Sequence, residues 1–146
     1  MAPHVLQVNG FSRRIFELPV DPDQSLRARF ERMDGARLFA FTMWPIAPGE
    51  DLETSHGEFG YIQCAGRADR LTVELREVVG AETNHVVLGV PTRSVGARDV
   101  EIAWADSATF VSPHERYDAA GAAALFMEFY ETGTVGASAM RRAIPL

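Results

Sequence analysis

The sequence predicts an α+β domain, with a mainly antiparallel sheet of about six to seven strands and two helices packed on one face. Three observations lead to this prediction. Several short segments alternate apolar and polar residues, as half-buried strands do. Two other segments repeat apolar residues at helical spacing. The connections between successive strand segments are short, which favours pairing of neighbours in the chain and leaves the helices to bury their stripes on the sheet.

The chain has the size and composition of one domain. Its 146 residues are 47% hydrophobic and 23% charged, which is too apolar for a disordered chain. Glycine and proline are spread along the sequence as turn residues, and there is no internal repeat. We therefore expect residues 1–146 to form a single domain.

The first elements are expected to be a strand and a helix. Residues 11–18 suit the strand. In the following segment apolar residues recur four and then three positions apart, which places them on one stripe of a helix. This stripe consists of Leu26, Phe30 and Met33. The pair Asp34-Gly35 is expected to stop the helix.

The middle of the chain is expected to supply the body of the sheet. Residues 37–44 are apolar at odd and even positions alike, which indicates a strand covered on both faces. Segments 58–65 and 70–77 have the pattern of two strands joined by residues 66–69, and 84–90 follows as a third member of the same antiparallel meander.

A second helix is expected from about Ala119 to Glu131. Asp118 is a suitable N-cap, because its carboxylate can accept from free N–H groups of the first turn. Gly133 stands where a left-handed residue closes a helix. The apolar face of this helix comprises Ala122, Leu125, Phe126, Phe129 and Tyr130.

The segments on either side of this second helix are less regular. Residues 100–104 and 108–111 have the composition of two short strands. Residues 135–146 show no periodicity, and we expect them to lie extended over the surface.

The sequence lacks the residues that several classes of catalytic and metal-binding site require. All 14 cationic residues are arginine, so there is neither a phosphate-loop lysine nor a Schiff-base lysine. The single cysteine, Cys64, allows no internal disulfide and no cysteine-based metal site. The four histidines stand at none of the spacings that present two imidazoles to one metal. We therefore predict no catalytic residue, no metal, no cofactor and no enzyme activity.

The net charge of the chain and its distribution limit the classes of molecule that it is expected to bind. The net charge is −6 with no basic cluster, which argues against direct nucleic-acid binding. Residues 21–60 hold much of the excess, with eight acids and four arginines. The N-terminus lacks the features of a signal peptide, and no apolar run is long enough to cross a bilayer. We expect a cytoplasmic protein with no membrane partner.

One loop concentrates the negative charge between aromatic residues. Residues 48–58, which we call the acidic loop, follow Trp44 and are followed by Phe59 and Tyr61. Charged side chains around an aromatic anchor are typical of protein-binding patches. The residues predicted to contact a partner protein are Glu50, Asp51, Glu53, Glu58, Trp44 and Tyr61.

Two other classes of function stay open. A small-molecule-binding or enzymatic domain would have a pocket between the sheet and the helix over residues 119–131. Polar groups such as His85, Glu74 and Arg76 would then converge in that pocket. An adaptor module would bind a different protein. A filled core would favour protein binding over the pocket.

Segments of the second half resemble immunity proteins of bacterial polymorphic toxin systems. The similar segments are residues 61–66 (YIQCAG), 71–76 (LTVELR), 112–118 (SPHERYD), the helix that ends with 125–133 (LFMEFYETG), and Arg141. The first 57 residues match nothing in that group, and Gly121 stands where an acid is expected. The resemblance implies a cytoplasmic protein that binds and neutralises a cognate toxin domain and has no catalytic residues. Such toxins are often nucleases or deaminases, whose basic clefts an acidic loop can enter.

Overall fold

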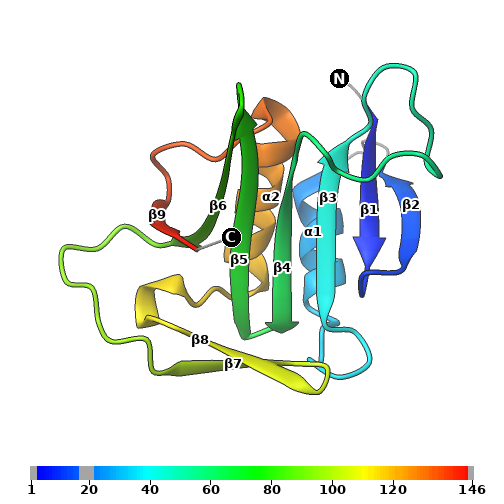
Figure 1. The fold of residues 1–146 in the computed structure, drawn as a ribbon. Helices are drawn as coiled ribbons and strands as arrows, with labels where there is room; N and C mark the ends of the chain where they lie inside the picture. Colours follow the sequence, from blue (N-terminus) through cyan, green and yellow to red (C-terminus); the bar gives the residue numbers. More distant parts are fainter. Residues whose placement is uncertain (1–2, 17–21, 145–146) are drawn as a thin grey trace.

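A computed structural model describes residues 3–16 and 22–144 of the chain (Figure 1). In chain order its elements are β1 (His4–Val8), β2 (Ser12–Phe16), α1 (Pro22–Phe30), β3 (Ala40–Pro45), β4 (Gly60–Arg67), β5 (Arg70–Val79), β6 (Glu82–Gly89), β7 (Val100–Trp104), β8 (Ser107–Val111), η1 (Pro113–Glu115), α2 (Ala119–Thr132) and β9 (Met140–Ala143). The end of the predicted strand 11–18, Glu17 and Leu18, lies outside the described residues, and so do the last two residues of the tail.

Seven strands form one antiparallel sheet in the order β2-β1-β3-β4-β5-β6-β9. The strands β7 and β8 pair with each other in a separate two-stranded sheet. Both α-helices lie on the same face of the large sheet (Figure 1). The predicted α+β class, with a mainly antiparallel sheet and two helices on one face, is therefore confirmed.

The main core lies between the large sheet and the two helices. The predicted stripe of the first helix is buried, although α1 ends at Phe30, short of the predicted stop at Asp34-Gly35, and Met33 lies beyond it. The predicted apolar face of α2 is buried as well. The two helices meet through Phe30 and Phe126, whose ring centroids are 4.8 Å apart. The sheet contributes the alternate residues of β5 that face the helices, Leu71, Val73 and Leu75. Because burial of each such side chain stabilises the fold by about 1.5–3 kcal/mol, this layer holds the molecule together.

Helix α2 has the ends that its sequence predicts. The Asp118 carboxylate accepts a hydrogen bond from the Gly121 N–H at 2.8 Å. At the other end Gly133 adopts a φ of 80°, and its N–H donates to the Phe129 carbonyl at 2.7 Å. A Cβ at position 121 would lie 2.9 Å from the Tyr117 ring. Close packing of that ring explains the glycine that stands where the resemblance expects an acid.

The opposite face of the sheet is covered at two places. Trp44 packs with Val5 and Ile46 beneath the connection 46–59. The β7–β8 hairpin, along the lower edge of Figure 1, packs Ile102 and Val111 on Val87. These two covers and the helix layer together explain why β3 is buried on both faces, as its sequence predicts.

Three features differ from the expectation drawn from the sequence. The strand β1 was not predicted, although it lies between β2 and β3. Residues 100–104 and 108–111 are strands as expected, but they form their own hairpin outside the main sheet. The tail is more regular than expected, because residues 140–143 pair with β6 as an edge strand. An edge strand of four residues is specified by the backbone groups of its neighbour, so its own sequence needs no alternation.

Candidate functional site

The residues predicted to contact a partner gather around one end of the sheet. The acidic loop lies in the connection between β3 and β4, the large loop at the upper right of Figure 1. Trp44 lies near the end of β3, and Tyr61 lies near the start of β4, so both aromatic side chains border this connection. The six predicted contact residues therefore lie in one region of the molecule. The structure shows that their side chains have different roles in it.

Two of the four predicted acids shape the loop itself. Asp51 Oδ1 accepts hydrogen bonds from the backbone N–H groups of Thr54 and Glu53, each at 3.0 Å. The bonds from Thr54 and then from Glu53 lower the pKa of the Asp51 carboxyl. Glu50 Oε1 accepts from the Ala47 N–H at 3.0 Å. These carboxylates close turns within the loop, which short acidic side chains do well.

The other two acids, Glu53 and Glu58, have no such internal role. Both side chains are exposed. Within residues 3–16 and 22–144, neither carboxylate takes part in an ion pair or a side-chain hydrogen bond. Their negative charge is therefore not neutralised by a neighbouring side chain in the described chain, and it faces solvent.

Two arginines of the sheet hold the acidic loop through its carbonyl groups. Arg13 of β2 donates to the Ser55 carbonyl at 2.9 Å. Arg76 of β5 donates to the Glu58 carbonyl at 3.3 Å. Because these guanidinium groups bind backbone oxygens, the carboxylates of the loop stay outside the contact. The loop is therefore anchored through its backbone, and neither arginine forms a described ion pair with a carboxylate of the loop.

Trp44 belongs to that anchor and not to the surface. Its side chain is 3% exposed, and its indole N–H donates to Ser55 Oγ at 2.8 Å. Gly57 adopts a φ of 67° against the ring, where a Cβ would lie 3.2 Å from Trp44 Cγ. The predicted role of Trp44 as a surface anchor is therefore corrected: the indole holds the loop from the inside.

The aromatic side chain on the surface is Phe59, beside the acidic loop. It is 69% exposed, whereas Tyr61 is half-buried against the cluster of Trp44. Sequence reasoning had treated Phe59 as a strand residue. The neighbouring Gly60 was the signal for its exposure, because β4 starts at this glycine, whose φ is 125°, two residues later than the predicted strand 58–65.

His85, Glu74 and Arg76 do lie near one another, but not in a pocket against α2. They occupy the face of the sheet opposite the helices, since their neighbours Leu75 and Val86 face the core. His85 Nε2 lies 3.0 Å from Glu74 Oε1, with its N–H too poorly aligned to form a hydrogen bond. The contact is thus an ion pair only when the ring is protonated. Among the described residues, core side chains occupy the space between the sheet and α2, and the polar groups expected in the pocket lie on the other face of the sheet.

The described residues offer no cluster of three histidine, cysteine or acidic side chains that could hold a metal ion. Cys64 is fully buried in the main core, and this burial raises the pKa of its thiol. A buried thiol with a raised pKa is a poor nucleophile. None of the helices that the structure describes is long and apolar enough to cross a membrane.

The motif 112–118, which carries part of the resemblance, has a structural role. Glu115 is 1% exposed and forms two hydrogen bonds with Arg142 of β9, at 2.8 Å and 3.1 Å. Its carboxylate also accepts from the Ser112 N–H at 2.9 Å. Tyr117 joins the edge of β5 through backbone bonds with Leu71. These contacts fix the start of α2 against the sheet.

A cavity is present on the helix side of the sheet, against α1 and not α2. It has a volume of about 490 Å³ and lies beside β1 and β2. Three of its lining residues are arginines, Arg14, Arg29 and Arg32. Sequence reasoning missed this site, because the residues come from separate segments that only the fold brings together.

No protein family model matches this chain, and neither the curated proteins nor the solved structures contain a significant match to it.

Proposed function

We propose that this chain is a cytoplasmic immunity protein, which binds a cognate toxin domain and blocks the active site of that toxin. The observation that carries the proposal is the pair of exposed carboxylates, Glu53 and Glu58, on a loop that arginines anchor through its carbonyl groups. Protein charges that are buried or paired internally are not available to a partner. These two are available, and the loop that carries them is fixed in shape.

The physical basis of the proposed contact is electrostatic attraction to a basic cleft. Enzymes that act on nucleic acid need positive charge to bind phosphate groups. Acidic side chains presented on a fixed loop would accelerate encounter with such a cleft and compete with its substrate. The exposed ring of Phe59 lies next to Glu58 and would supply apolar contact area, since aromatic residues are enriched among the residues that dominate interface energies.

The resemblance to immunity proteins supports the same function from other residues. Of the similar segments, 61–66 and 71–76 lie in β4 and β5, 112–118 leads into α2, 125–133 closes α2, and Arg141 lies in β9. Because these segments build the scaffold, their similarity supports a shared fold with such proteins. The proposed contact surface is the acidic loop, which lies outside them. The proposal assigns no catalytic residue to the chain.

The proposal is tested by co-expression with the protein encoded by the neighbouring gene. We expect the two proteins to copurify, and we expect this chain to restore growth of cells that express the neighbour. The double variant Glu53→Arg/Glu58→Arg should weaken both effects. The matched control Glu101→Arg/Asp106→Arg changes the charge equally at exposed acids of the β7–β8 hairpin, and it should behave as the unchanged protein.

Two results would contradict the proposal. One is a failure of the neighbouring product to copurify with the folded chain. The other is equal weakening by both double variants, which would mean that overall charge and not the acidic loop determines binding.

A further inference from the structure

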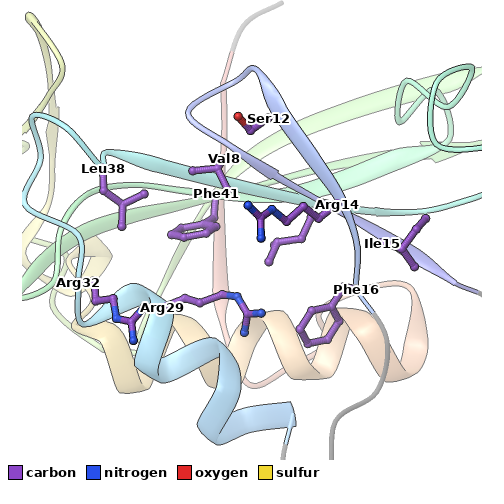
Figure 2. A pocket seen from close by; sticks show the side chains of 10 residues that line it. Val8, Ser12, Arg14, Ile15, Phe16, Arg29, Arg32, Leu38 and Phe41 are labelled. Carbon is purple, nitrogen blue, oxygen red and sulfur yellow. The ribbon is translucent and has the colours of Figure 1, made fainter.

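The cavity beside α1 combines an apolar wall with cationic side chains. Its volume of about 490 Å³ lies within the range of small-molecule sites, about 300–1,000 Å³. The apolar lining comes from β1, β2, β3 and the segment before β3, and it consists of Leu6, Val8, Ile15, Phe16, Leu38 and Phe41. Figure 2 shows Arg14 projecting into this space from the strand side and Arg29 from the helix side, with Arg32 farther along.

No carboxylate of residues 3–16 and 22–144 neutralises these three arginines. None of them forms an ion pair within the described part of the chain. The acid of this region that does form a described ion pair, Glu31, binds the exposed Arg27 instead. Burial lowers the pKa of the Arg29 guanidinium, and the charges of Arg14 and Arg32 lower it further. The chain has 20 acids and 14 arginines. A cluster of arginines without described acidic partners is therefore unusual for a chain with this net negative charge.

Contacts with described residues hold the side chain of one of these arginines and not those of the other two. Arg29 donates to the Ser25 carbonyl at 3.1 Å, and its guanidinium carbon lies 5.7 Å from the centroid of the Phe16 ring. The guanidinium groups of Arg14 and Arg32 make no hydrogen bond to any residue that the structure describes. Arg29 is thus positioned in advance, and the other two guanidinium groups keep their donors for a ligand.

We propose that this cavity binds a small amphipathic anion, a carboxylate or phosphate carried on an apolar body. The anionic group would lie between Arg14 and Arg29, because the planar guanidinium fork suits carboxylate and phosphate oxygens. The apolar body would lie against Phe41 and Leu38, where it removes hydrophobic surface from water. A ligand of this kind satisfies both halves of the lining at once. The inference rests on the cavity alone and is independent of the proposed immunity function.

Isothermal titration calorimetry with three matched probes tests the proposal on the intact chain. Octanoate has both the charge and the apolar body, octanamide has only the apolar body, and acetate has only the charge. We expect octanoate to bind at one site. We expect octanamide and acetate each to bind about tenfold more weakly or worse, since a hydrogen bond to a charged group and a buried alkyl chain both contribute measurably.

Variants then locate the site. Arg14→Gln should weaken octanoate binding about fivefold to tenfold, and so should Arg29→Gln. The Arg14 side chain makes no described hydrogen bond, so its variant tests the site even if the loss of Arg29 from Ser25 and Phe16 disturbs the fold. The matched control is Arg27→Gln, which removes the same charge from the same helix at an exposed position.

The proposal is overturned if octanoate does not bind, or if octanamide or acetate binds as tightly as octanoate. It is also overturned if Arg27→Gln weakens binding as much as Arg14→Gln does. In that last case the anion is attracted by the general charge of α1 and its surroundings and not held in the cavity.

Discussion

Glu115 shows at the scale of one residue how the C-terminal third is attached to the sheet. Its buried carboxylate would be costly without partners, because removing a charge from water carries a penalty of several kcal/mol. Arg142 and the Ser112 N–H supply those partners from two separate segments. Burial by itself would raise the pKa of Glu115, but the bonds from Arg142 and Ser112 outweigh it and lower the pKa. The ionised form is thus the one that stabilises the fold.

This pairing predicts a pH-dependent effect of Glu115→Gln. At neutral pH we expect the free energy of unfolding to fall by about 2 kcal/mol, since Arg142 loses a charged partner and is itself only partly buried. A carboxyl whose pKa is lowered in the folded state stabilises the fold above its ordinary value of 4.5 and loses that effect as the pH falls through the folded value. Urea unfolding should therefore show the difference between the variant and the unchanged protein shrinking in acid.

The control for this prediction is Glu101→Gln, at an exposed acid of β7. Its unfolding free energy should stay within about 0.5 kcal/mol of the unchanged protein. A difference between Glu115→Gln and the unchanged protein that is equally large at neutral and at acid pH would show that the ion pair is not its cause.

At the scale of elements, the parts with local signals could be predicted and the others could not. Helix α2 carries its cap at Asp118, its apolar face and its closing Gly133 within one continuous segment, and the structure confirms all three. In the meander of β4, β5 and β6, residues 71–76 of β5 alternate apolar and polar side chains, and short turns join the three strands. By contrast, β9 pairs with a strand that lies far away in the sequence, as when Val87 pairs with Arg142, and β1 pairs with the distant β3 as well as with its neighbour β2. A strand of about five residues does not contain a sequence signal that identifies a distant pairing partner.

The cap of α2 provides a prediction at this scale. Asp118→Ala should lower the free energy of unfolding by about 1 kcal/mol, because the Gly121 N–H loses its acceptor at the helix start. For a domain of this size the melting temperature should fall by about 3 °C. Asp118→Asn keeps an acceptor oxygen and should melt close to the unchanged protein. If both variants melt alike, the side-chain bond contributes nothing to the helix.

At the scale of the whole molecule, the sequence located the candidate contact region but not the arrangement within it. The acids could be assigned to a loop from their setting between two strands. The burial of Trp44 could not, because it results from the loop folding back so that Ser55 reaches the indole. The cavity beside α1 was equally out of reach, since it needs Arg14 of β2 and Arg29 of α1 to face each other across the fold. The sequence shows which residues a segment contains. A site also depends on which faces of the helices and strands pack against each other, and this is set by the fold.

The charge arrangement of the whole molecule gives the central claim its clearest test. The claim is that Glu53 and Glu58 serve to attract a positively charged protein. The direct measurement is the association rate with the neighbouring gene's product, followed by stopped-flow fluorescence over a range of salt concentrations. We predict that Glu53→Gln/Glu58→Gln associates about tenfold more slowly at low salt and with a flatter salt dependence. The matched control Glu101→Gln/Asp106→Asn should keep the original rate, and an unchanged rate and salt slope for the loop variant would contradict the account.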